Sequence, residues 1–220
     1  MRKSAHGLFT NRFIRELKSL IEKHHIAYPV IPPQGIFFES LVERAYKRAG
    51  WTEAQVVATS RNSPKHDLMV GTEKMSLKTE TGQITREHLV SITKLCTTER
   101  EPWDSPTLIG HAMDHLSRYD YMLMLRAIWK PGFIHYQLVD VPIKLLKLIG
   151  KVVVTPVGRR KGRKSLAADI QIQSEVAFHV HFDGADGKCQ IRNLPVSRCR
   201  MLLEWDQPIV EEGLTLLAPE

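Results

Sequence analysis

Two residues with complementary chemistry, Asp67 and Lys78, lie in the segment 67–80, which reads DLMVGTEKMSLKTE. Two short extended runs flank the letters GTEK, so the segment predicts a β-hairpin. If its strands pair around that turn, the carboxylate and the ammonium lie close together at the same end of the hairpin. Such a pair suits phosphodiester hydrolysis, in which a carboxylate holds Mg²⁺ and a lysine activates water. An ordinary surface ion pair would place the same residue types together, and that alternative stays open.

The residues around this pair follow a recognisable order. A helix-like stretch, GIFFESLVERAYKRAGW at 35–51, precedes SPKHDLMV at 63–70 and MSLK at 75–78. This order resembles the PD-(D/E)XK nuclease superfamily, and in particular its type II restriction endonucleases. The motif is short, so the resemblance is a hypothesis that the structural context must support.

The resemblance implies an α/β (α+β) fold with a mixed central sheet flanked by helices, and a site that uses Mg²⁺. It assigns Asp67 to metal binding, Lys78 to the role of catalytic lysine and Glu39 to that of the supporting helix glutamate. The SPKHD stretch corresponds to the proline-aspartate element of the family, with two residues inserted between Pro64 and Asp67.

The chain departs from the family pattern at Ser76, which stands where the lysine triplet has an acidic residue. A second carboxylate for the metal must then come from elsewhere. Glu87, in the first turn of a helix predicted from Thr85, is one candidate, although acidic side chains also suit helix N-termini for electrostatic reasons. Glu80 is another because it shares a strand face with Lys78. Glu39 or a water-filled site are the remaining alternatives, and without a second carboxylate the protein would bind DNA without cutting it.

The apolar periodicity indicates the elements that position these residues. It predicts helices over 11–25, 36–49, 85–96, part of 111–120 and 142–150, the 67–80 hairpin, and buried strands over 121–129 and 133–141. The remainder of the chain is β-rich. We therefore expect a single nuclease domain over 1–220, with an N-terminal helix and linker (1–34), a catalytic core (35–150) and a β-rich DNA-recognition extension (151–220). The apolar stripe of the N-terminal helix is a candidate for a dimer contact, and packing on the protein's own core is the alternative.

The charge pattern predicts a polyanionic partner. The net charge is +7, and the stretch 158–164 reads GRRKGRK, which favours a basic loop contacting phosphates or a merely solvated loop. Beyond it, alternating polar side chains on strands are suited to reading bases in a groove. The predicted DNA contacts are Arg159, Arg160, Lys161, Arg163, Lys164, Gln171, Gln173, His179, His181, Arg192, Arg198 and Arg200. The two histidines could instead hold a metal, but no third ligand stands near them in the sequence.

Other patterns narrow the class of protein. The three cysteines have no zinc-type spacing, and no apolar run approaches the length of a membrane span, so we expect a cytoplasmic protein. The stretch HAMDHLSRYD at 111–120 has histidines and aspartates at helical spacing, as many solvated pairs do, and it has no nucleophile motif, which argues against serine or cysteine hydrolase chemistry. The favoured hypothesis is a site-specific, Mg²⁺-dependent endonuclease that cuts double-stranded DNA as a homodimer. A structure-specific repair or recombination nuclease and a non-cleaving DNA-binding module are the alternatives.

Overall fold

The computed structural model describes residues 7–59, 67–98, 102–158 and 162–209. The helices are α1 (Asn11–Ala27), α2 (Ile36–Arg48), α3 (Ser105–Ser117) and α4 (Ile143–Leu146), with short 3-10 helices at Lys147–Lys151 and Val196–Arg198. The strands are β1 (Val56–Ala58), β2 (Leu68–Val70), β3 (Glu73–Glu80), β4 (Leu89–Thr97), β5 (Tyr121–Lys130), β6 (Phe133–Asp140), β7 (Thr155–Val157), β8 (Ser165–Ile172), β9 (Glu175–Phe182), β10 (Lys188–Pro195) and β11 (Arg200–Pro208).

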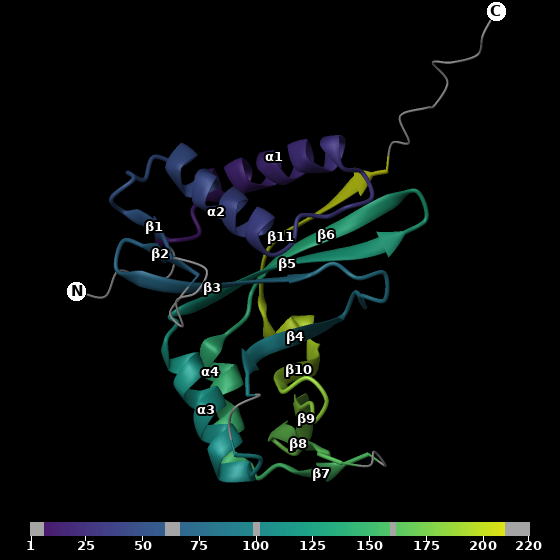
Figure 1. The fold of residues 1–220 in the computed structure, drawn as a ribbon. Helices are drawn as coiled ribbons and strands as arrows, with labels where there is room; N and C mark the ends of the chain where they lie inside the picture. The colour runs from purple at the N-terminus through teal and green to yellow at the C-terminus, as the bar shows by residue number, and fades with distance from the viewer. Residues whose placement is uncertain (1–6, 60–66, 99–101, 159–161, 210–220) are drawn as a thin grey trace, which may run out of the picture.

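The strands form two sheets. The first has the order β1-β2-β3-β5-β6-β11 and the second the order β4-β10-β9-β8-β7. Only the β3–β5 pairing is parallel among the strand pairs of the described residues, so the first sheet is mixed. Helices α1 and α2 cover one side of this sheet, while α3, α4 and the second sheet lie on its other side (Figure 1). The predicted mixed sheet with flanking helices is therefore confirmed.

The helices α1 and α2 form because each has an apolar stripe and a defined start. The side chain of Thr10 caps α1 by accepting a hydrogen bond of 3.1 Å from the Phe13 amide. The rings of Phe13 and Tyr46 stack with their centroids 3.9 Å apart, which joins α1 to α2 over the sheet. The apolar stripe of α1 is thus buried in the protein's own core, the alternative to a dimer contact that the sequence left open.

The helix predicted over 85–96 is wrong, because this segment contains strand β4. Val90 and Ile92 face the core with the two-residue alternation of a strand, but the register against β10 then shifts, and Leu95 and Cys96 are both buried. Because of this register shift, the buried residues of β4 are spaced in a way that resembles the pattern of a helix. The pairing with β10 decides the outcome, since it satisfies the main-chain groups that a helix would otherwise pair internally.

The remaining elements agree with the sequence patterns. Helices α1 and α2 and the β2–β3 hairpin lie where they were predicted, and the predicted helix over 142–150 consists of α4 and the 3-10 helix after it. Helix α3 begins at Ser105, six residues before the predicted helix, so part of the expected proline-containing loop is helical. Strands β5 and β6 are central and largely buried, as their apolar runs indicated. The expected boundary at residue 150 does not separate the two sheets, because β4 joins the second sheet and β11 pairs with β6 in the first. No helix in the described ranges has the length and apolarity of a membrane span.

Arg126 on β5 is a buried cation at the junction between the two sheets. Its side chain is 0% exposed and forms an ion pair of 2.8 Å with Glu80 on β3. Gln137 on β6 accepts another of its hydrogen bonds. The remaining guanidinium donors reach the main-chain carbonyls of Arg86, Glu87 and Leu89. Arg126 therefore fixes the segment that leads from β3 into β4.

Replacing this cation tests its contribution to stability. We expect Arg126→Met to lower the free energy of unfolding by about 3 to 5 kcal/mol, because it leaves a buried carboxylate without its partner. The control is Lys130→Met, which removes a half-exposed ion pair to Glu87 and should cost less than about 1 kcal/mol. Urea unfolding followed by circular dichroism measures both. A loss at Arg126 no larger than that at Lys130 would contradict this role.

Asp140, at the end of β6, is a carboxyl group whose pKa burial raises to about 6, although the charge of Arg200 partly opposes the shift. The folded protein therefore holds this proton more tightly than the unfolded chain does. Its contribution to stability is fully present below about pH 4 and is lost as the pH rises through about 6.

The variant Asp140→Asn removes this titration. Relative to the parent protein, its free energy of unfolding should rise by about 1 to 2 kcal/mol between pH 4 and pH 7.5, a value that allows for partial solvent exposure. Urea titrations of both proteins at the two pH values measure the change. An identical difference between the proteins at both pH values would show that Asp140 does not titrate in this range.

Candidate active site

Asp67 directly precedes β2, at the end of the hairpin away from its turn. The register of the hairpin pairs Leu68 with Met75, which places Asp67 opposite Ser76. One carboxylate oxygen, Oδ2, accepts hydrogen bonds from the Leu77 amide at 2.7 Å and the Ser76 hydroxyl at 3.2 Å. The side chain thus takes the place of a main-chain acceptor beside β3.

Lys78 follows on the same face of β3 as Ser76, because side chains alternate along a strand. This face looks toward α3 and the second sheet, whereas Met75 and Leu77 point into the core beneath α1 and α2. The strand therefore separates polar from apolar side chains, as the sequence alternation indicated. Lys78 itself is partly exposed.

A hydrogen-bonded tyrosine-histidine pair is influenced by both Asp67 and Lys78. The phenol of Tyr119 and Nε2 of His115 are 3.0 Å apart. Burial, and then the charge of Asp67, raises the pKa of Tyr119 to about 12. Burial, and then the charge of Lys78, lowers the pKa of His115 to about 4. Asp67 and Lys78 thus each affect the pKa of one member of this pair.

A hollow of about 330 Å³ opens beside Asp67, between the start of α2, the end of β1 and the start of β2. Glu39 on α2 lines this hollow together with Asp67. Glu43 also lines it, but its carboxylate is 2.7 Å from the Lys47 ammonium. Two carboxylates from different elements therefore border the same space, which includes the helix glutamate expected from the sequence.

The two other candidates for the second carboxylate are engaged elsewhere. Glu80 is largely buried and pairs with Arg126, and burial raises its pKa against the opposing effect of that cation. Glu87 belongs to the loop before β4, so the prediction that it lies in the first turn of a helix is wrong. Its carboxylate lies 2.6 Å from the Lys130 ammonium, which lowers its pKa. Both side chains have structural partners that a metal would have to displace.

The donor set around Asp67 fits a hard divalent cation. Both hydrogen bonds to its carboxylate use Oδ2, and within the described residues none reaches Oδ1. Mg²⁺ in nuclease-type sites takes one or two carboxylates and completes its shell with water and phosphate oxygens. No group of three or more metal-binding side chains occurs in the described part of the chain. Asp67 and Glu39, which border the same hollow, are carboxylates of the kind that such an ion takes.

The predicted DNA contacts are distributed over the second sheet and its neighbours. Arg159, Arg160 and Lys161 lie outside the described residues. Arg163 lies over the ring of Trp103 at 4.2 Å and donates to the Gly184 carbonyl, so its guanidinium is partly engaged by the protein. Lys164 is exposed.

His179 and His181 lie on the outer face of the second sheet, next to Gln190 and Arg192 of β10. Asp169 of β8 bonds Nδ1 of His179 at 2.5 Å, and burial lowers the pKa of His181. Arg192 is exposed and bonds to Gln190. No cluster of metal-binding side chains involves these two histidines in the described ranges. The geometry therefore favours a polar outer face over a metal site.

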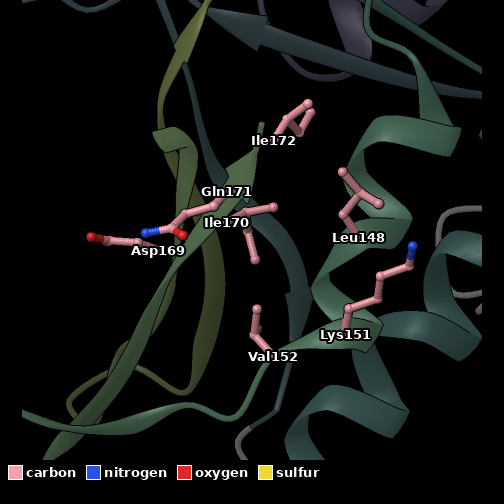
Figure 2. A pocket seen from close by; sticks show the side chains of 7 residues that line it. All are labelled: Leu148, Lys151, Val152, Asp169, Ile170, Gln171 and Ile172. Carbon is pink, nitrogen blue, oxygen red and sulfur yellow. The ribbon is translucent and has the colours of Figure 1, made fainter. Parts of the chain in front are cut away.

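The remaining predicted contacts lie near the edges of this sheet. Gln171 and Gln173 are exposed at the end of β8, Arg198 pairs loosely with Glu175 at 3.5 Å, and Arg200 is exposed at the start of β11. A second hollow, of about 470 Å³, lies between the 3-10 helix after α4 and β8. Figure 2 shows Leu148 and Lys151 on its helical side, while the Gln171 side chain extends away from them. This hollow shares no lining residue with the one beside Asp67.

Comparison with known proteins identifies the family of the chain. A sequence profile of the SmaI family, described as type II site-specific deoxyribonuclease, matches residues 2–207. The type II restriction enzyme SmaI of Serratia marcescens is 25% identical over 154 residues, which cover 68% of this chain and 62% of that enzyme. The chain thus spans less than two thirds of its curated relative. No solved structure gives a significant match. The expected likeness to type II restriction endonucleases is confirmed, and the chain belongs to the SmaI family of type II site-specific deoxyribonucleases.

Proposed function

We propose that this protein is a Mg²⁺-dependent endonuclease that cuts double-stranded DNA at a specific sequence, acting as a homodimer in the cytoplasm. The observation that carries the proposal is the hairpin register, which places Asp67 opposite Ser76 with Lys78 two residues farther along β3, together with the hollow that Asp67 and Glu39 line. Membership of the SmaI family and the net charge of +7 support a DNA substrate. Two-fold symmetric dimers match palindromic sites, which supports the homodimer.

In this mechanism Asp67 and Glu39 hold Mg²⁺, which when bound polarises the scissile phosphate and makes a nearby water more acidic. Asp67 is preoriented for this task because the Leu77 amide and the Ser76 hydroxyl fix Oδ2. The Lys78 ammonium orients the attacking water and stabilises the negative charge that develops on phosphorus. His115 remains uncharged near neutral pH, since its pKa is lowered to about 4, and so it adds no second cation beside Lys78.

DNA binding is proposed to use cations of the second sheet and the adjoining basic loop. Lys164 and Arg192 are exposed there, and the outer face between them presents His179 and His181. Arginine and glutamine side chains suit guanine and adenine edges, whereas lysines contact phosphates without reading sequence. The second sheet would therefore supply both the phosphate contacts and the base contacts.

Substitution at the two central residues tests the catalytic part. We expect Asp67→Asn and Lys78→Ala each to lower the cleavage rate at least about 100-fold, because each removes a group required at the scissile phosphate. Binding to DNA without Mg²⁺ should change less than about threefold, since contacts elsewhere supply most of the affinity. Phage DNA incubated with Mg²⁺, followed by sequencing of the fragment ends, measures cleavage, and a filter-binding titration measures affinity.

Lys74→Ala is the matched control for these variants, because Lys74 is an exposed lysine on the same strand. It should cut as the parent protein does. Cleavage by Lys78→Ala at the parent rate would remove Lys78 from the mechanism. Fragments with random ends would favour a structure-specific nuclease, and binding without any cleavage by the parent protein would favour a non-cleaving module.

The dependence of DNA binding on salt tests the proposed phosphate contacts. The logarithm of the association constant should fall steeply and linearly with the logarithm of salt concentration, because bound phosphates release counterions. Lys164→Gln should make this slope shallower by about one unit, as expected for one lost phosphate contact. Lys23→Gln, on the exposed side of α1, is the control and should leave the slope unchanged. A flat response of the parent protein would argue against a DNA partner.

A further inference from the structure

An arginine stacked on a tryptophan lies just before β8. The guanidinium carbon of Arg163 is 4.2 Å from the centroid of the Trp103 ring. Its Nε donates to the main-chain carbonyl of Gly184 at 3.0 Å. The indole Nε1 of Trp103 donates in turn to the Lys164 carbonyl at 2.6 Å. The tryptophan thus contacts the guanidinium with its face and bonds to the neighbouring main chain with its edge.

The main chain that carries Arg163 is fixed as well. Gly184 is buried, and its amide donates to the Ser165 hydroxyl at 3.1 Å. A Cβ atom at position 184 would overlap the main-chain carbonyl of Arg163, so only glycine allows this close approach. The loop between β9 and β10 and the segment before α3 therefore both bond to the chain around Arg163.

The two terminal amino groups of Arg163 are its remaining donors. Within the described residues they have no hydrogen-bond acceptor, and no carboxylate lies within ion-pair distance of the guanidinium. The neighbouring acidic side chains have other partners. Asp104 caps α3 by accepting from the Thr107 amide. Asp183 accepts from the Ala185 amide. A half-buried cation with two unpaired donors is suited to binding an anion that has two acceptor oxygens.

We propose that Arg163 is a pre-oriented contact for a DNA phosphate and that Trp103 is the positioning residue that holds its guanidinium. The inference rests on the proposed function, because it assigns a partner to one cation of the same DNA-binding surface. A guanidinium held by a stacked ring and by Nε loses little side-chain freedom on binding, and its terminal groups match two phosphate oxygens. The exposed Lys164, by contrast, contacts phosphate as a flexible point charge.

The proposed phosphate contact is separate from the candidate active site. The strands β7 and β8 form the end of the second sheet that lies away from the first sheet, α1 and α2 (Figure 1). None of the residues around Arg163 lines the hollow beside Asp67. A phosphate bound here is held equally before and during hydrolysis, so the contact should add affinity and leave the chemical step unchanged.

Substitutions of Arg163 test the phosphate contact. The probe is a fluorescein-labelled DNA duplex of mixed sequence, and its affinity is measured by fluorescence anisotropy without Mg²⁺ at several salt concentrations. Arg163→Gln removes the charge, so the salt slope should become shallower by about one unit. Arg163→Lys keeps the charge but loses the stacked, forked group. Its affinity should therefore fall about three- to tenfold while the slope stays unchanged.

Substitutions of Trp103 test the positioning role. Trp103→Leu removes the aromatic face beneath the guanidinium, so it should lower the affinity as Arg163→Lys does, again with the slope unchanged. Trp103→Phe is the conservative variant, because it keeps an aromatic face. Its affinity should stay within about twofold of that of the parent protein, as expected when the stacking contact is retained.

Double variants separate positioning from folding. Trp103→Leu and Trp103→Phe both lose the indole hydrogen bond to the Lys164 carbonyl, so the difference between them reports the aromatic face beneath Arg163. This difference should vanish when each is combined with Arg163→Gln. Trp129→Leu is the matched control, because Trp129 is also partly buried and donates from Nε1 to a main-chain carbonyl, that of Thr81. It should leave the affinity and the slope unchanged.

Cleavage of phage DNA with Mg²⁺ separates this inference from the proposed function. The Arg163 variants should raise the Michaelis constant and leave kcat within about twofold. If Arg163→Gln binds DNA with the affinity and slope of the parent protein, the phosphate contact is overturned and the nuclease proposal stands. A difference between the Trp103 variants that persists beside Arg163→Gln overturns the positioning role. If the parent protein neither cuts DNA nor binds it in a salt-dependent way, both proposals are wrong.

Discussion

The candidate site depends on one hydrogen bond of the sheet in which a side-chain carboxylate takes the place of a main-chain acceptor. Oδ2 of Asp67 accepts from the Leu77 amide, so that donor is paired beside the start of β2. The second carboxylate oxygen has no hydrogen-bond partner among the described residues. The amide and the Ser76 hydroxyl thus hold the carboxylate in one orientation beside β3, the strand that carries Lys78.

The two faces of the first sheet differ in polarity. One face is apolar and packs beneath α1 and α2, where Phe13 and Tyr46 stack. The other face carries Ser76 and Lys78 and meets α3 and the second sheet. Arg126 fixes the segment that leads from the first sheet to the second, since its guanidinium binds both Glu80 and the carbonyls before β4. The distance between the cleavage site and the proposed DNA-reading surface is therefore set by a buried cation rather than by a flexible connection.

Local patterns predicted much of the fold, and long-range pairing explains where they failed. The apolar stripes of α1 and α2 and the turn of the β2–β3 hairpin are short-range signals, and each led to the right element. The segment of β4 had a helical spacing only because an irregular pairing with β10 buries Leu95 and Cys96 together, and that partner lies far along the chain. For the same reason Tyr119 was not among the predicted site residues. Its spacing of four from His115 was visible, but its proximity to Ser76 arises only when β5 lies parallel to β3.

A carboxylate held by neutral donors differs physically from a pair of neighbouring carboxylates. Two carboxylates close together repel each other, and one of them must bind a proton or a cation for both to stay in place. The Leu77 amide and the Ser76 hydroxyl hold Asp67 without adding charge, so the orientation of its carboxylate does not require a cation to be present. Under the proposed function, such a site would be weaker as an isolated cation site, because fewer negative charges would face the ion. The missing ligands would come from Glu39 and from the phosphate of the substrate, so metal binding would depend on bound DNA. The metal would then be held tightly only where a phosphodiester is already positioned beside Lys78.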